Sequence, residues 1–237
     1  MSRIAGTIRF AIAAAGSMAF AALELAGIAL RLGDRVFHAL ARAWARTTLW
    51  ICGVRVVVRG LEKLAQGRGY VYVSNHASMF DIPVILASIP DQIRIMYKRE
   101  LHRIPVFGWG LRFGSYIPID RGSGPGAVRS LERAAARIRG GASVLLYAEG
   151  TRTEDGRLQP FKRGAFHLAV KAGVPVVPLT VNGSYGILPK RSTAVRPGTV
   201  ELVLEHPIPI RGEGKEEERR LMEEVRAAIG KHYRSQE

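Results

Sequence analysis

Runs of apolar residues divide the chain into a long hydrophobic beginning and a body of short alternating blocks. Between Arg9 and Arg31 the sequence reads FAIAAAGSMAFAALELAGIAL, in which Glu24 is the only charged residue. As a helix this run would be about 31 Å long, which is close to the thickness of the hydrocarbon core of a bilayer. The pattern predicts a membrane segment that either spans the bilayer or enters one leaflet and returns. A cleavable signal peptide is disfavoured because the run is longer than a typical signal core.

The segment that follows is amphipathic at helical spacing. Its basic residues fall on one face and its apolar residues on another; the two sets are Arg31, Arg35, His38, Arg42 and Arg46, and Val36, Phe37, Leu40, Trp44 and Ile51. We expect a cationic helix that lies in the headgroup layer of a membrane. The alternative is a helix packed on the soluble body with a solvated arginine stripe. Residues 1–50 are thus predicted to form a helical membrane anchor, with residues 51–237 as one domain on the cytoplasmic face.

From residue 54 onward, short β-rich blocks alternate with helical blocks. Strands are predicted at 54–60, 70–74, 93–97, 115–119, 143–148, 174–181 and 199–208. Helices are predicted at 79–88, 106–112, 127–139 and 162–171, followed by a terminal helix that carries Leu221, Val225 and Ile229. This alternation is typical of an α/β fold with a mostly parallel sheet flanked by helices.

Charge and cysteine content narrow the range of partners and compartments. The formal net charge of +15 favours an anionic partner, such as nucleic acid, an acidic protein, a phosphorylated small molecule or an anionic membrane. Nucleic acid is not expected, because no binding motif with interleaved aromatic residues is visible. The single cysteine, Cys52, excludes an intramolecular disulfide and a thiolate metal cage, and we expect it to be buried.

The stretch NHASMFD sets His76 and Asp81 five positions apart, between a predicted strand and a predicted helix. The two side chains can meet if His76 lies in the turn and Asp81 in the first helical turn, with Ser78 as the N-cap. A carboxylate bonded to one ring nitrogen would make the other nitrogen a better general base. Because no G-x-S-x-G nucleophile motif is present, the activated hydroxyl is expected to belong to the substrate. The alternative is a capping aspartate beside an unrelated loop histidine.

Polar and cationic groups also follow three other predicted strands, in the stretches MYKREL, YIPIDR and YAEGTRTEDG. These groups are Lys98, Arg121, Glu149, Gly150, Thr151 and Arg152. Because ligands bind open α/β sheets at the carboxyl ends of their strands, we expect these groups to share one rim with His76. Arginine presents a planar fork of donors that suits phosphate oxygens. A base beside such groups, on a membrane-anchored body, predicts a lipid substrate with both a hydroxyl and a phosphate.

Taken together, these motifs resemble those of the glycerolipid acyltransferase family, specifically its bacterial 1-acyl-glycerol-3-phosphate acyltransferases. Four family blocks match in order: N-H-x4-D at 75–81, the block ending I-D-R at 114–121, F-P-E-G-T-R-S at 147–153, and a V- and P-rich block at 174–181. The resemblance covers roughly residues 50–210 and implies a glycerol-3-phosphate acyltransferase-like fold. Tyr147 stands where the family usually has Phe, and Ala148 where it has Pro. The loss of that proline should loosen the turn before Glu149.

The resemblance implies acyl transfer from acyl-CoA or acyl-carrier protein to the 2-hydroxyl of lysophosphatidate, giving phosphatidate without a metal or other cofactor. It implies that His76 is the general base and Asp81 its orienting partner. The implied acceptor-binding residues are Lys98, Arg121, Glu149, Gly150, Thr151 and Arg152. The implied location is the bacterial inner membrane. Two alternatives stay open: an acyltransferase for another lyso-lipid, such as lyso-ornithine lipid, and a non-catalytic tether for anionic membranes.

Overall fold

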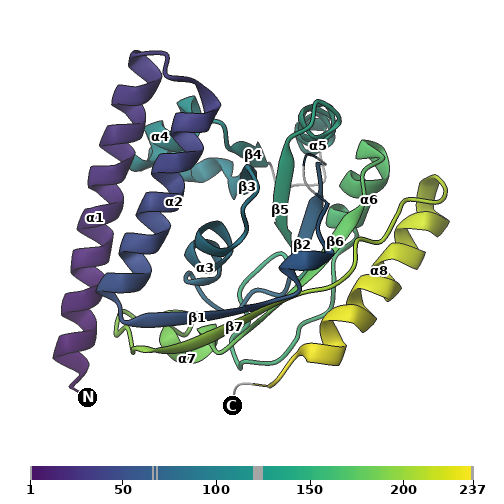
Figure 1. The fold of residues 1–237 in the computed structure, drawn as a ribbon. Helices are drawn as coiled ribbons and strands as arrows, with labels where there is room; N and C mark the ends of the chain where they lie inside the picture. Colours follow the sequence, from purple (N-terminus) through teal and green to yellow (C-terminus); the bar gives the residue numbers. More distant parts are fainter. Residues whose placement is uncertain (1, 66, 68, 120–124, 236–237) are drawn as a thin grey trace.

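The computed structural model describes residues 2–65, 67, 69–119 and 125–235, which form two helical layers around a sheet (Figure 1). The α-helices are α1 (Arg3–Ala29), α2 (Gly33–Ile51), α3 (Asp81–Ser88), α4 (Phe107–Phe113), α5 (Pro125–Arg139), α6 (Arg163–Ala172), α7 (Ser184–Ile187) and α8 (Gly214–His232). The strands are β1 (Val54–Arg59), β2 (Val71–Ser74), β3 (Ile93–Lys98), β4 (Ile117–Ile119), β5 (Ser143–Tyr147), β6 (Val176–Asn182) and β7 (Gly198–Leu204). Two short 3-10 helices are η1 (Leu61–Lys63) and η2 (Arg99–Arg103).

The strands form one sheet in the order β1-β7-β6-β2-β5-β3-β4. Neighbouring strands run parallel, except for β6 and β7, which pair antiparallel. Strands β2 to β6 therefore end at the same edge, while β1 and β7 run the other way. The predicted α/β class with a mostly parallel sheet is confirmed, and each predicted strand is present with bounds shifted by a few residues.

Each face of the sheet carries its own hydrophobic core. Along β2 the side chains alternate, so that Tyr72 joins the core beneath α2 and α3, whereas Val71 and Val73 join the core beneath α5, α6 and α8. The spacing of Leu221, Val225 and Ile229 predicts one buried stripe along a helix. All three residues lie in the core beneath α5, α6 and α8. Cys52 is fully buried, as expected.

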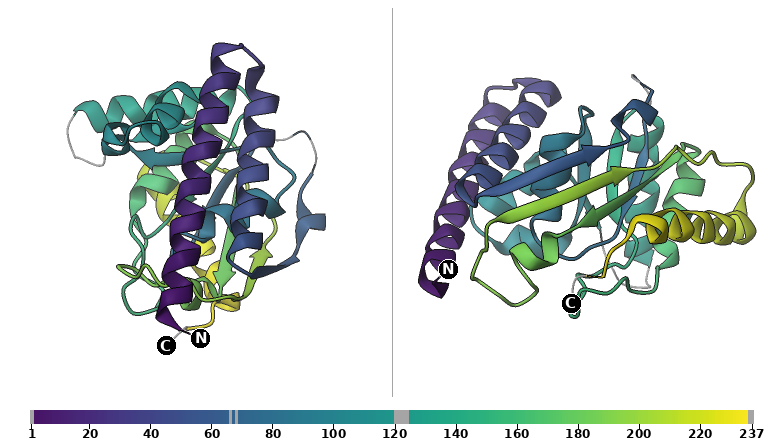
Figure 2. Two further views of the ribbon diagram at one scale, coloured as in Figure 1. Left: turned by 90° about the vertical axis from the view of Figure 1, so that its left-hand side faces the viewer. Right: turned by 60° about the horizontal axis from the view of Figure 1, so that its bottom comes forward.

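Helices α1 and α2 form an antiparallel pair along one side of the molecule, with α1 outermost (Figure 2). The indole Nε1 of Trp44 on α2 donates to Ser17 Oγ on α1 at 2.9 Å. Among the described helices, α1 is the one long and apolar enough to cross a membrane. Its outer face exposes Ile4, Ile8 and Ile12, at 72%, 54% and 49%. The predicted long apolar helix is present, and it offers a lipid-compatible surface.

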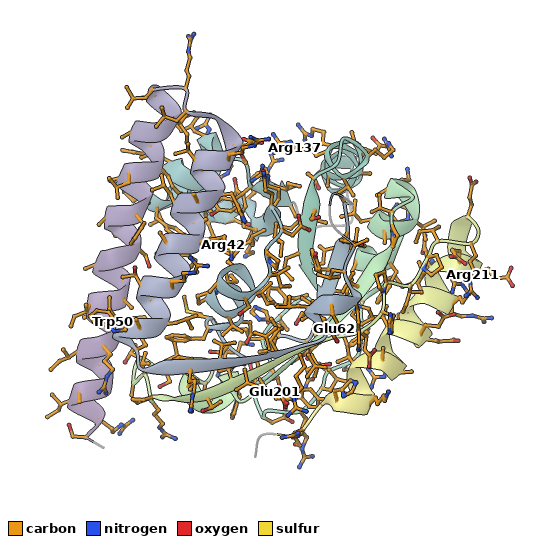
Figure 3. The ribbon with its side chains drawn as sticks, viewed as in Figure 1. Arg42, Trp50, Glu62, Arg137, Glu201 and Arg211 are labelled. Atoms are coloured by element: carbon orange, nitrogen blue, oxygen red, sulfur yellow. The ribbon has the colours of Figure 1, made fainter. Side chains whose placement is uncertain are left out.

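Helix α2 packs on the body of the protein, as the alternative expected, although its arginine stripe is not wholly solvated. Its residues Phe37, Ala41, Ala45 and Leu49 belong to the core that also contains α3. Part of the predicted cationic stripe faces inward. His38 is buried, and Arg42 extends toward α3 (Figure 3). The guanidinium of Arg42 donates to the Ala87 carbonyl at 3.4 Å. The division into residues 1–50 and 51–237 stays a prediction.

Candidate active site

The turn between β2 and α3 brings His76 and Asp81 together. The Nδ1 atom of His76 lies 2.7 Å from Oδ2 of Asp81, which is the first residue of α3. The same oxygen accepts hydrogen bonds from the backbone N–H groups of Ala77 and Ser78, at 2.8 and 3.0 Å. A carboxylate is favoured at this place because the N-terminus of a helix carries partial positive charge. No described residue bonds Nε2 of His76.

The cap of α3 differs from the prediction. Phe80 precedes the helix and makes no side-chain capping bond, so Ser78 is not the N-cap. The hydroxyl of Ser78 instead donates to the Leu188 carbonyl at 2.9 Å and accepts from the Phe80 N–H at 3.2 Å. The bond from the Ser78 N–H to Asp81 is one that the predicted capping box requires, but the helix begins at Asp81 and not at Met79, so Phe80 occupies the N-cap position.

Two buried side chains hold the backbone around His76. The amide of Asn75 exchanges two hydrogen bonds with the backbone of Val181 on β6, at 2.9 and 2.8 Å. The carboxylate of Glu149 accepts from the N–H of His76 at 2.6 Å and from the N–H of Gln159 at 2.9 Å. Burial raises the pKa of Glu149 to about 7, although these two bonds oppose the shift. Both oxygens of Glu149 are thus engaged by the protein's own backbone.

One face of the imidazole is covered by an aromatic ring that the sequence did not lead us to expect. Tyr147, the last residue of β5, stacks on His76 with ring centroids 3.7 Å apart and planes 13° apart. The strand register explains the contact, because Tyr147 lies opposite Ser74, two residues before His76. The Tyr147 hydroxyl is buried and has no hydrogen-bond partner among the described residues.

The turn before Glu149 is firmly bonded. The N–H of Ala148 donates to the Ser74 carbonyl at 3.0 Å, and the N–H of Gly150 donates to the Tyr147 carbonyl at 3.1 Å. A proline at position 148 could not make the first of these bonds. The alanine therefore makes a bond between β2 and β5 that a proline would lack, and the expectation of a looser turn stays a prediction.

His76 and Arg152 line the same cavity, whose volume is about 450 Å³. Its other walls are mostly apolar and come from α1, α2, α3 and the segments around Ile104 and Leu188. A smaller cavity of about 120 Å³ shares the walls at Ser17 and Trp44 and continues between α1 and β3. Sequence reasoning missed this space because its walls come from positions scattered along the chain.

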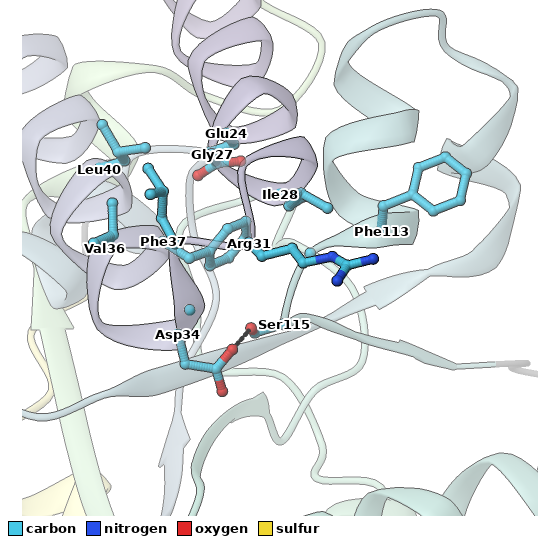
Figure 4. A pocket seen from close by; sticks show the side chains of 13 residues that line it. Glu24, Gly27, Ile28, Arg31, Asp34, Val36, Phe37, Leu40, Phe113 and Ser115 are labelled. Atoms are coloured by element: carbon cyan, nitrogen blue, oxygen red, sulfur yellow. Dashed lines mark hydrogen bonds between the residues drawn. The ribbon is translucent and has the colours of Figure 1, made fainter.

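Another cavity, of about 320 Å³, lies at the turn between α1 and α2 (Figure 4). It is lined by Glu24, Arg31, Asp34 and Ser115, among others, and Asp34 accepts a hydrogen bond from the Ser115 hydroxyl. None of the predicted site residues that the structure describes lines it, so the cavity at His76 is the candidate active site.

The structure does not bring all predicted acceptor-binding residues together. Lys98 lies at the end of β3, where its amine is 3.3 Å from a carboxylate oxygen of Glu100, and it is not among the described residues that line the cavity. Thr151 is exposed, and Gly150 adopts a positive φ of 71° that suits glycine. Arg152 forms no hydrogen bond or ion pair with described residues. Arg121 lies outside the described residues.

The family model described as Acyltransferase matches residues 55–182, which is more than half of the chain and includes His76, Asp81 and the 149–152 stretch. The chain belongs to the acyltransferase family. The walls that α1 and α2 give to the cavity lie outside the stretch that this family model covers.

Named relatives extend this family assignment. A chloroplastic 1-acyl-sn-glycerol-3-phosphate acyltransferase of Brassica napus is 37% identical over 75% of this chain and 52% of its own length. A 1-acyl-sn-glycerol-3-phosphate acyltransferase of Pseudomonas aeruginosa is 36% identical over 72% of this chain and 67% of its own. The chain spans about half the length of several curated relatives that it matches.

One solved structure has nearly the same overall fold as this protein. The crystal structure of the 1-acyl-sn-glycerophosphate (LPA) acyltransferase from Thermotoga maritima superposes with a TM-score of 0.81 at 28% identity. The match covers 95% of this chain and 92% of that one, so it includes helices α1 and α2 as well as the α/β body.

Proposed function

We propose that the protein is a 1-acyl-sn-glycerol-3-phosphate acyltransferase, which moves an acyl chain from acyl-CoA or acyl-carrier protein to the 2-hydroxyl of lysophosphatidate. The observation that carries the proposal is the bonded His76 and Asp81 pair opening into a mostly apolar cavity that also contains Arg152. The names of the relatives support the choice of acceptor.

The roles follow from the geometry of the pair. Asp81 bonds Nδ1 of His76, so Nε2 is free to take the proton of the acceptor hydroxyl. The hydroxyl oxygen attacks the thioester carbonyl carbon, the carbon–sulfur bond breaks, and the imidazolium returns its proton to the leaving thiolate. Asp81 stabilises the imidazolium between these steps. The reaction consumes one lysophosphatidate and one thioester, and yields phosphatidate and a free thiol.

Two kinds of surface suit the two parts of the substrates. The apolar walls of the cavity suit an acyl chain, which gains free energy when it leaves water. Arg152 is assigned to the acceptor phosphate, because it lines the same cavity and its guanidinium forms no bond with a described residue. Lys98, Arg121, Gly150 and Thr151 stay predictions for acceptor binding.

The proposed location is the bacterial inner membrane, with the catalytic body on its cytoplasmic face. The exposed apolar face of α1 supports membrane association, and the net charge of +15 supports an anionic membrane surface. Lipid substrates would then reach the cavity without leaving the bilayer.

The test uses the purified full chain in phospholipid vesicles and measures thiol release from matched acyl-CoA and acyl-carrier-protein donors. His76→Ala should abolish turnover, and the exposed His206→Ala should leave it unchanged. Retained turnover in His76→Ala would refute the general-base role. Comparable rates with lyso-ornithine lipid, which lacks a phosphate, would overturn the proposed acceptor.

A second comparison examines the phosphate contact. Arg152→Ala should raise the KM for lysophosphatidate, by roughly tenfold or more, because a charge-assisted contact is lost. Arg219→Ala, which changes an exposed arginine on α8, is the control for net charge. An unchanged KM in the Arg152 variant would remove this residue from the acceptor site.

A further inference from the structure

The imidazole of His76 is restrained in two perpendicular directions. Asp81 bonds Nδ1 in the plane of the ring, at 2.7 Å. Tyr147 covers one face of the ring, with centroids 3.7 Å apart and planes only 13° apart. A hydrogen bond alone lets the ring tilt about it, whereas a stacked partner resists tilting. The two contacts together fix the direction in which Nε2 points.

The near-parallel geometry suits a charged imidazole better than a neutral one. Two neutral aromatic rings prefer offset or edge-to-face arrangements over direct stacking. A cation over an aromatic face is attracted to the negative charge on that face, and the attraction is greater when water is excluded. The stack therefore favours the imidazolium that exists after His76 has accepted a proton.

The phenol hydroxyl contributes nothing visible to this arrangement. It is buried without a hydrogen-bond partner among the described residues, and burial raises the pKa of Tyr147 well above its usual value. The hydroxyl therefore stays neutral and makes no described bond to His76. The useful part of Tyr147 is its ring, which phenylalanine would also provide.

We propose that Tyr147 is a positioning residue whose ring fixes the plane of His76 and supports its positive charge during acyl transfer. The inference rests on the proposed function, because it assumes that His76 takes the hydroxyl proton. Tyr147, which directly precedes the buried Ala148 and Glu149, would thus have a role in the reaction. Tyr147 itself is not a lining residue of the cavity among those described.

Replacement of the ring separates this role from simple packing. Tyr147→Phe should keep kcat within about twofold, whereas Tyr147→Leu should lower kcat by roughly tenfold with little change in either KM. The assay is thioester release by the full chain in vesicles, with the melting temperature and vesicle binding of each variant as folding controls. A Tyr147→Leu variant that folds and turns over as fast as Tyr147→Phe would overturn the proposal.

A series of fluorinated phenylalanines at position 147 decides the question even if Tyr147→Leu does not fold. Fluorine withdraws charge from the face of the ring while its shape changes little. We expect kcat to fall stepwise from phenylalanine to its monofluoro and trifluoro forms, with melting temperatures unchanged. A kcat that does not respond to fluorination would overturn the charge-supporting role.

His76→Ala, measured in parallel, distinguishes failure of this inference from failure of the proposed function. If His76→Ala still turns over, the proposed function fails whatever position 147 shows. If His76→Ala is inactive but the ring series has no effect, only the role of Tyr147 is refuted.

Discussion

Glu149 accepts a hydrogen bond from the backbone N–H of His76 at 2.6 Å, across 73 positions of sequence. The other carboxylate oxygen accepts from the N–H of Gln159. The buried side chain of Glu149 therefore connects the turn that contains His76 to the loop that follows β5 and contains Gln159. A residue predicted to contact the acceptor lies where it can also hold the base in place.

Glu149→Gln should lower kcat more than it raises the KM for the acceptor. A glutamine has one oxygen and one NH2 group, so it can accept from only one of the two backbone N–H groups and opposes the other. We expect a loss of roughly tenfold or more in kcat, because a small displacement of the base is costly. Steady-state kinetics with varied lysophosphatidate checks this, and a pure KM effect would instead favour direct acceptor binding.

The same carboxyl should make stability depend on pH. Its pKa rises from 4.5 to about 7 on folding, so between these values the folded chain holds a proton that the unfolded chain has lost. This group therefore costs stability as pH rises from 4.5 to 7, by up to roughly 3 kcal/mol. Melting temperatures of the wild type should fall relative to Glu149→Gln between pH 5 and pH 8. Glu213→Gln, at an exposed position before α8, should show no such trend relative to the wild type.

Ala14→Trp should narrow the cavity beside His76 and affect donors according to the length of their acyl chain. Ala14 lines the cavity from α1, so a larger side chain there takes space from the apolar part of the substrate. Losing burial of two or three methylene groups raises the KM of a long-chain donor by roughly tenfold or more, while short-chain donors are spared. Ala15→Trp, at the next and exposed position of α1, is the control. Equal effects on short and long donors would contradict this use of the cavity.

Ile8→Ser together with Ile12→Ser should weaken binding to vesicles. Both side chains are about half exposed on the outer face of α1, at 54% and 49%. Their loss from a lipid environment should reduce vesicle binding by at least about tenfold, as measured by co-sedimentation. Val57→Ser, at an exposed apolar position of β1, should leave binding unchanged. Deletion of residues 1–50 is a poorer test, because it also removes buried residues of α2 from the core.

Local pattern was sufficient to predict the strands, the main helices and the meeting of His76 with Asp81. Alternation and turn spacing depend on neighbouring residues, and these two residues are only five positions apart. The stacked Tyr147, the backbone bonds of Glu149 and the inward placement of His38 and Arg42 on α2 were missed. Each depends on pairing between distant segments, such as the register of β2 against β5. The predicted N-cap at Ser78 was wrong for a local reason, since Met79 and Phe80 form a turn and the helix begins only at Asp81.

Helix α1 has two different surfaces. One side contributes Phe10, Ala13 and Met18 to the wall of the cavity beside His76, and the other side exposes apolar residues outward. A truncated form that lacks α1 would therefore lose part of the wall of the candidate active site together with the exposed apolar surface.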